Sequence, residues 1–306
     1  MIVQNNLAKS TKSLNSAIER MTTGYKINHA ADNAAGYSIA RNWEAQISSL
    51  DIASENAATG ADMLSTLEDN YALISSHVQR VRDLTEQAAN GTYGEQSKKA
   101  IESEIKARLE EINRIALNCE YNGIKMMDGT NNSAKSIQVG IDGNSAKSQI
   151  SLSAELFASG KIDELFHIAD TTDTSANYDP RSTGETSTDA DKVLAKKLEN
   201  LAKDCAGTST DAGKKTSQYM LGTLDKVIAR ISDRITTLGA AQNRIESAIE
   251  SIGIQSENIT SSLSTLRDAD VATESSNYIK AQILQQASAT LLATANQSPS
   301  IALNLL

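Results

Sequence analysis

The sequence contains little proline, cysteine or aromatic side chain: its 306 residues include two prolines, two cysteines and 4% aromatics. Cys119 and Cys205 can form one disulfide at most, which excludes a disulfide framework around a small core, and we expect no bridge. Hydrophobic residues make up 40% of the chain, enough for a core, while small side chains are plentiful. Small side chains favour helices packed along their length, so the composition predicts long helices.

Clustered positive charge and long apolar runs are also missing. The formal net charge is −9, and no basic tract offers the Lys and Arg side chains that phosphate binding requires, which argues against nucleic acid as a partner. No run approaches the roughly 20 apolar residues of a membrane span. Residues 1–6 have neither a charged lead nor an apolar stretch, so we expect no cleavable signal peptide and another route of export.

Motifs of catalysis and metal binding are not found. His29, His77 and His167 are isolated, and none belongs to a His-Glu-x-x-His pattern. The sequence has no Gly-x-Ser-x-Gly elbow, phosphate loop or dinucleotide fingerprint. The acidic pair Glu110-Glu111 lies among Lys and Arg residues, which favours a solvated helix face over acid–base catalysis. We therefore expect no enzyme activity, no metal and no cofactor.

A heptad ladder near the C-terminal end is the strongest pattern present. Its steps alternate four and three without a slip, which keeps one narrow stripe facing a partner helix as in coiled coils. Two polar members, Gln242 and Ser256, are expected to help fix the register. The ladder consists of Leu224, Ile228, Ile231, Ile235, Leu238, Gln242, Ile245, Ile249, Ile252, Ser256, Ile259, Leu263 and Leu266.

A second ladder in the N-terminal half supplies the partner. It runs through Leu64, Leu67, Tyr71, Ile74, Val78 and Val81, and less strictly back through Ala57, Leu50, Ile47 and Trp43. Asn90-Gly91-Thr92-Tyr93-Gly94 breaks this helix, and another begins whose apolar positions are Ile101, Ile105, Leu109, Ile112 and Ala116. We expect that helix to stop at Asn122-Gly123, a C-terminal glycine signal. The pattern predicts a long antiparallel helical bundle of at least three helices.

The segment between the ladders predicts smaller elements. Residues 126–129 and 137–144 have the pattern of short strands closed by Gly-rich turns, so we expect one or two hairpins in residues 124–150. Residues 171–188, rich in Ser and Thr, predict an exposed loop, and residues 191–203 a short helix.

The two cysteines differ in their predicted surroundings. Cys119 is in step with the third helix, which predicts a packed seam position, whereas Cys205 lies in a Lys- and Asp-rich stretch and is expected to be a surface thiol.

Both chain ends carry apolar stripes with few charges. Val3, Leu7, Ser10, Leu14, Ala17 and Met21 form a short ladder, and residues 271–306 contain only Glu274 and Lys280 as charges. Burying one Leu or Ile is worth roughly 1.5–3 kcal/mol, and short isolated helices are marginal in water. We therefore expect the ends to be mobile alone and to order only against other copies of the chain. The predicted polymerisation residues are Leu7, Leu14, Met21, Ile283, Leu284, Leu291, Leu303, Leu305 and Leu306.

The same ends carry motifs that resemble those of bacterial flagellins. On the N-terminal side these are Ser13-Leu14-Asn15, Gly24-Tyr25-Lys26-Ile27-Asn28 and Ala30-Ala31-Asp32-Asn33-Ala34-Ala35-Gly36. On the C-terminal side they are Leu238-Gly239-Ala240-Ala241-Gln242-Asn243-Arg244, Asp268-Ala269-Asp270 and Ala281-Gln282-Ile283-Leu284-Gln285-Gln286-Ala287. Together the matches cover about residues 1–150 and 216–306. One departure is Cys119, which stands where flagellins commonly have Ser or Thr.

The resemblance implies a subunit that polymerises into the extracellular flagellar filament for swimming motility. It implies an inner filament-lining domain of residues 1–42 and 267–306, a surrounding helical domain of residues 43–170 and 216–266, and a short variable surface insert at 171–215. It further implies unfolded type III export with an export chaperone, and contacts with hook-associated and cap proteins. Two alternatives remain open at this point, a hook–filament junction protein and a secreted coiled-coil adhesin.

Recognition by a vertebrate Toll-like receptor is implied by two further matches, Gln79-Arg80-Val81-Arg82-Asp83-Leu84 and Arg108-Leu109-Glu110-Glu111-Ile112-Asn113-Arg114. The residues expected to bind are Arg80, Leu84 and Glu111. Arg80 and Leu84 are four residues apart and are expected to share a face displaced from the packed stripe, with Glu111 on the neighbouring helix. The alternative is that all three are solvated positions that make salt bridges between subunits.

Overall fold

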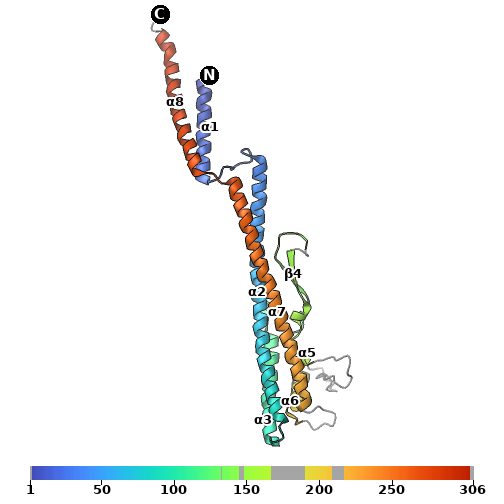
Figure 1. The fold of residues 1–306 in the computed structure, drawn as a ribbon. Coiled ribbons are helices and arrows are strands. Elements are labelled where there is room, and N and C mark those ends of the chain that lie inside the picture. Colours follow the sequence, from blue (N-terminus) through green and yellow to red (C-terminus); the bar gives the residue numbers. More distant parts are fainter. Residues whose placement is uncertain (1, 132, 145–147, 167–189, 209–216, 304–306) are drawn as a thin grey trace. The chain divides into compact units, whose positions relative to one another are not determined.

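The computed structural model describes residues 2–131, 133–144, 148–166, 190–208 and 217–303. Contacts within the chain divide it into two compact units, a terminal unit of residues 1–52 with 252–306 and a central unit of residues 53–251. Two long helices, α2 (Ala34–Ala89) and α7 (Ser217–Arg267), each contribute one end to the terminal unit and the rest to the central unit (Figure 1).

In the terminal unit, α1 (Ile2–Thr23) packs alongside α8 (Val271–Leu303). Arg20 and Glu274 form an ion pair of 3.2 Å between the two helices. Farther along, the Gln285 amide donates a hydrogen bond to the Thr11 hydroxyl at 3.2 Å. The expectation that the ends have no partner within one subunit is therefore wrong, because each terminal helix covers part of the other.

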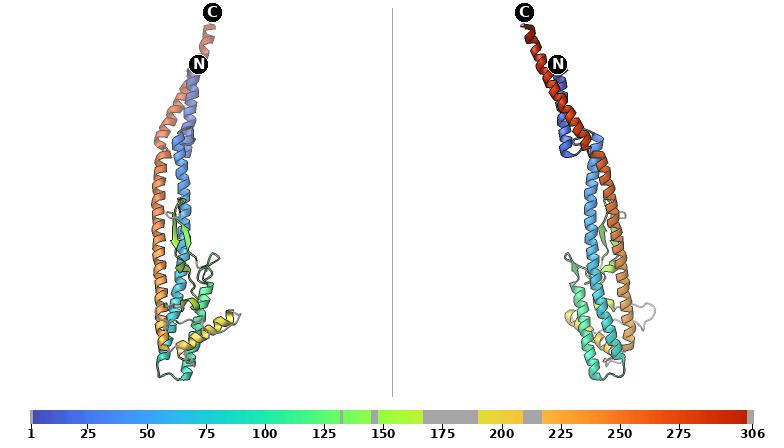
Figure 2. Two further views of the ribbon diagram at one scale, coloured as in Figure 1. Left: turned by 90° about the vertical axis from the view of Figure 1, so that its right-hand side faces the viewer. Right: turned by 60° about the vertical axis from the view of Figure 1, so that its left-hand side comes forward.

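In the central unit, α2, α7 and α3 (Glu95–Asn118) lie side by side, as both views of Figure 2 show. The predicted break is confirmed, since α2 ends at Ala89 and α3 begins at Glu95. Both ladders are confirmed as the packed stripe, because their central-unit members are buried or half-buried. Gln242, a polar member of its ladder, donates a hydrogen bond of 2.8 Å across to Glu68 on α2.

Two antiparallel hairpins confirm the prediction for the segment after the third helix. The first joins β1 (Glu120–Tyr121) to β2 (Ile124–Lys125), and the second joins β3 (Lys135–Gln138) to β4 (Gln149–Leu152). The expected strand at residues 126–129 does not form, and the strand expected over 137–144 ends at Gln138. Met126 and Met127 are buried, so this short stretch fills the core rather than pairing as a strand.

The Asn122-Gly123 dipeptide is a hairpin turn and not the end of a helix, which corrects the expected boundary of α3. Asn122 and Gly123 have φ angles of 48° and 76°, the left-handed values that both central residues of a type I′ turn require. The helix ends earlier, at Asn118, and the Cys119 amide still donates to the Ile115 carbonyl. The glycine that was expected to end α3 thus belongs to the turn of the following β1–β2 hairpin.

The predicted short helix near residue 200 is confirmed as α6 (Ala190–Ala206), which lies against α3. Its Leu198, Leu201 and Cys205 side chains are buried, so the expectation of a surface thiol at Cys205 is wrong. The charged neighbours of Cys205 misled because they do not mark a surface position here: Asp204, the adjacent residue, is buried as well. Part of the range 171–215, expected to be a surface insert, is therefore core, whereas the predicted loop at 171–188 lies outside the described residues.

Candidate polymerisation and recognition surfaces

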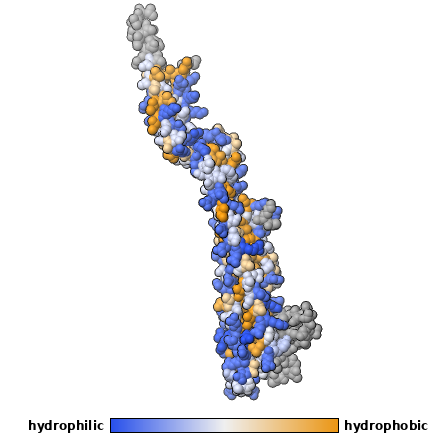
Figure 3. All heavy atoms as spheres, viewed as in Figure 1, coloured by the Kyte–Doolittle hydropathy of each residue, from blue (hydrophilic) through white to orange (hydrophobic). Residues whose placement is uncertain are grey.

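The α1–α8 pair carries apolar side chains on faces that the pair itself does not cover. On α8, Ile283 is 60% exposed, Leu291 is 59% exposed and Leu284 is 48% exposed. On α1, Leu7 and Leu14 are half-buried, while Met21 is exposed near the end of the helix. Figure 3 shows apolar residues gathered on the surface of this pair. Leu303 is the last residue of α8 and its side chain is not described, and Leu305 and Leu306 lie outside the described residues.

This exposure follows from the sequence of α8. A helix with one neighbour needs a single apolar stripe, but α8 also carries apolar residues on its other faces. Its buried positions are small or polar, including Ala281, Ser288 and the paired Glu274. The larger Ile and Leu side chains are left exposed, with Leu284 and Leu291 at the groove between α8 and α1. A surface of this kind gains about 1.5–3 kcal/mol for each such side chain that a neighbouring molecule covers fully.

A groove of about 990 Å³ runs between α1 and α8. Lys9, Lys12 and Lys280 line it together with small polar side chains such as Ser13 and Ser16. Among the residues that the structure describes, no group of three His, Cys, Asp or Glu side chains could hold a metal ion.

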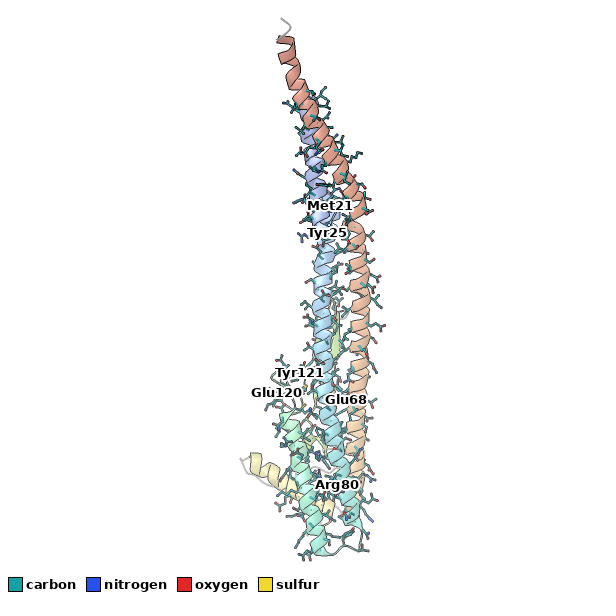
Figure 4. The ribbon with its side chains drawn as sticks, turned by 90° about the vertical axis from the view of Figure 1, so that its left-hand side faces the viewer. Met21, Tyr25, Glu68, Arg80, Glu120 and Tyr121 are labelled. Carbon is teal, nitrogen blue, oxygen red and sulfur yellow. The ribbon has the colours of Figure 1, made fainter. Side chains whose placement is uncertain are left out.

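The predicted receptor-binding residues lie where α2 and α3 run side by side. Arg80 lies on α2 in the lower part of Figure 4. It donates from Nε and Nη2 to Glu104 Oε1 at 3.0 and 2.9 Å, so it pairs across the two helices. Arg108 lies 3.9 Å from the same carboxylate. Glu111 accepts from Arg114 on its own helix at 2.6 Å, and this hydrogen bond lowers the pKa of Glu111. The face carries two groups of ion pairs that are open to solvent, one around Glu104 and one between Glu111 and Arg114.

Leu84 does not belong to this exposed face. Its side chain is 1% exposed and packs in the core, which corrects the expectation that it lies beside Arg80 and away from the packed stripe. Thr85 and Ala88 are buried as well, so the buried arc of α2 is wide at this level.

Glu104, the partner of Arg80, was missed by sequence reasoning. Arg80 and Glu104 are equally far in sequence from Thr92, at the turn between two antiparallel helices. Such symmetry places two residues at the same height, and opposite charges there form a pair. That signal was available once the turn had been recognised.

Family comparisons agree with this architecture. The model of the bacterial flagellin N-terminal helical region matches residues 1–132, and that of the C-terminal helical region matches residues 221–306. A flagellin of Xenorhabdus nematophila is 36% identical over 307 residues, covering 100% of this chain and 96% of the relative. A flagellin of Bacillus subtilis (strain 168) is 32% identical over 322 residues, covering 99% and 95%.

One solved structure shares the fold. It comes from Vibrio parahaemolyticus and is provisionally named as a flagellar hook-associated protein. The TM-score is 0.57 at 16% identity, and the match covers 78% of this chain and 100% of the other.

These matches, together with the paired terminal helices and the helical bundle, define the class of protein as a structural subunit of a filament. The chain belongs to the bacterial flagellin family. It is a structural subunit of the extracellular flagellar filament, which serves motility, and not an enzyme. Nothing in the comparisons favours the junction protein or the adhesin. No helix in the described part of the chain is long and apolar enough to cross a membrane.

Proposed function

We propose that the α1–α8 pair makes the contacts that build the filament. Residues 1–42 and 267–306 then form the inner, filament-lining domain, and residues 43–170 and 216–266 surround it together with α6. The observation that supports this assignment is the apolar exposure of α8, led by Ile283 and Leu291. When neighbouring copies of the chain bury these side chains, the removal of apolar surface from water stabilises the filament contact.

Two changes on α8 test the assignment against a matched control. Ile283→Asn and Leu291→Asn should each raise the protein concentration needed for filament growth, with little change in helix content. Ile254→Asn is the control, because Ile254 is 55% exposed on α7, outside the α1–α8 pair. Filament growth is followed by light scattering and electron microscopy. Equal effects at all three positions would contradict the assignment.

Removing the end of α8 gives a second test. A chain that lacks residues 286–306 should keep a folded central unit, because none of the central unit's core residues is removed. It should fail to polymerise, since Leu291 and the last part of α8 are gone and only Ile283 and Leu284 of the exposed stripe remain. Thermal unfolding followed by circular dichroism checks the fold, and electron microscopy checks assembly. Normal filaments from the truncated chain would rule the proposal out.

We propose that an export chaperone and the hook-associated and cap proteins bind the same terminal helices. A subunit that exposes Ile283, Leu284 and Leu291 has to be kept from premature assembly before export, and covering that stripe would do so. Purified chaperone should protect the full chain from polymerisation and should bind the chain that lacks residues 286–306 more weakly, because Leu291 is removed while Ile283 and Leu284 remain. Equal binding to both forms would place the chaperone elsewhere.

We also propose that a Toll-like receptor reads the face of ion pairs formed by Arg80, Glu104 and Glu111 in the monomer. Leu84 is buried and would act by supporting α2 from beneath rather than by direct contact. Arg80→Ala and Glu111→Ala should weaken receptor binding without loss of fold. Lys99→Ala is the control, since Lys99 pairs with Glu95 on the exposed side of α3. Unchanged affinity for Arg80→Ala and Glu111→Ala would remove this surface.

A further inference from the structure

The connections that link the terminal helices to the long helices are bonded to each other. The connection between α1 and α2 meets the connection between α7 and α8 through two backbone hydrogen bonds. The Lys26 amide donates to the Arg267 carbonyl at 2.7 Å, and the Ala269 amide donates to the Gly24 carbonyl at 2.8 Å. The Lys26 ammonium also donates to the Thr265 carbonyl at 2.8 Å. The two connections, residues 24–26 and residues 267–269, thus form a single joint within the terminal unit.

Arg267 lies at the centre of this joint. Its guanidinium carbon is 4.1 Å from the centre of the Tyr25 ring, and it forms an ion pair with Glu44 on α2. Its side chain is only 13% exposed. One side chain at the end of α7 therefore contacts both the connection between α1 and α2 and the first part of α2.

These contacts need an arginine. A planar guanidinium can stack on an aromatic ring while its nitrogens donate to a carboxylate, whereas the compact ammonium of lysine cannot do both with the same geometry. Burial strengthens such a contact because water competes less for the cation. The ring contact and the ion pair of Arg267 add to the backbone hydrogen bonds and to the Lys26–Thr265 hydrogen bond, so we expect closure of the joint to depend on Arg267.

We propose that Arg267 is a positioning residue for assembly, which locks the two connections into one joint so that α1 and α8 leave it as a pair. The inference rests on the proposed role of the α1–α8 pair in filament contacts. With an open joint, the two helices would have to be ordered separately when a neighbouring subunit binds. A closed joint removes part of that conformational freedom beforehand, which favours binding through preorganisation.

Arg267→Lys tests the lock, and the chain supplies a matched control in Arg41→Lys. Arg41 pairs with the same Glu44 at 3.0 Å and its guanidinium lies 5.2 Å from the Tyr37 ring centre, but all of these contacts stay within one exposed stretch of α2. Arg267→Lys should raise the critical concentration for polymerisation roughly two- to thirtyfold, the range that corresponds to loss of one cation–π contact. Arg41→Lys should leave it unchanged.

Hydrogen exchange on the monomer shows whether the joint itself has opened. The amide protons of Lys26 and Ala269 should lose protection in Arg267→Lys and keep it in Arg41→Lys. The thermal midpoint of the central unit should be the same in both variants, which separates a positioning role from general loss of fold. Unchanged protection and unchanged critical concentration in Arg267→Lys would refute the lock.

A disulfide across the joint provides a rescue that replaces the lock by a covalent bond. Tyr25 and Asp268 are antiparallel bridge partners, and such partners have Cα atoms about 4.5–5.5 Å apart, within the range that a disulfide spans. Tyr25→Cys and Asp268→Cys in the Arg267→Lys chain should restore the original critical concentration when oxidised and not when reduced. An oxidised chain that still assembles poorly would refute the lock. Failure of the unmodified chain to polymerise at all would instead contradict the proposed function.

Discussion

Gly60 gives the sharpest prediction about how the β3–β4 hairpin is held on the bundle. Gly60 lies in the interior of α2, and a Cβ atom there would lie 2.3 Å from Cδ1 of Ile137 on β3. The same Cβ would lie 3.2 and 3.3 Å from Cγ1 and Cγ2 of that side chain. The absence of a side chain at Gly60 therefore makes the space that Ile137 fills.

The magnitude follows from two opposing effects. Alanine in place of glycine stabilises a helix interior by roughly 0.5–1 kcal/mol. Forcing an extra methyl into a packed site costs about 1–3 kcal/mol. Gly60→Ala should therefore destabilise the central unit by about 1 kcal/mol. Gly239→Ala should stabilise it by roughly 0.5–1 kcal/mol, because a Cβ at Gly239 on α7 meets no atom within 4 Å.

Urea denaturation followed by circular dichroism measures both changes, and a third variant identifies the cause. Ile137→Val removes Cδ1, so the loss caused by Gly60→Ala should be smaller in the Ile137→Val background. Hydrogen exchange at Ile150, the strand partner of Ile137, should rise in Gly60→Ala if the hairpin moves away from α2. If Gly60→Ala stabilised the chain as much as Gly239→Ala, the close approach of Ile137 would be refuted.

Three further outcomes follow from local contacts. Burial raises the pKa of the Cys205 thiol to about 12, so a thiol reagent at pH 8 should modify Cys205 only after unfolding, and rapid labelling of the native chain would contradict its burial. A Cβ at Gly140 would lie 3.0 Å from the Cα atom of Ser148 across the hairpin while one at Gly143 meets nothing, so Gly140→Ala should increase hydrogen exchange in the β3–β4 hairpin and Gly143→Ala should not. Hydrogen bonds from the Thr273 side chain and from two backbone amides lower the pKa of the Asp270 carboxyl below its usual range. The ionised carboxylate therefore stabilises the start of α8 fully above about pH 4, and this stabilisation is lost as the pH falls through the lowered pKa. Acid titration should then increase hydrogen exchange at the start of α8.

The long helices and their pairing could be predicted because a regular heptad pattern determines which face of a helix packs against a partner. Steps of four and three return to the same side of a helix, so the run from Leu224 to Leu266 required a long partner, and the run from Leu64 to Val81 was the matching one. Both runs are packed in the structure. The break between α2 and α3 was equally clear, because glycine and asparagine interrupt the apolar periodicity there.

Local signals were less informative where two elements follow closely. Asn122-Gly123 after an apolar helix has the same composition as a helix end and as a hairpin turn, and only the pairing of β1 with β2 distinguishes them. Cys205 was assigned to the surface from its charged neighbours, although its own helical face is covered by α3 and α2. In both cases the deciding contact came from residues distant in sequence.

Leu84 shows the physical limit of a ladder most directly. A strict ladder describes a helix with one neighbour, so it accounts for Val81 and leaves Leu84 outside the stripe. Near its C-terminal end α2 contacts α7 through the Arg82–Asp225 ion pair and α3 through the Arg80–Glu104 ion pair. A helix between two neighbours buries a wider arc, and Leu84 falls within it. The sequence of one helix cannot show how many neighbours it has at each level, so residues that flank a predicted stripe have to be assigned from the neighbours and not from the spacing.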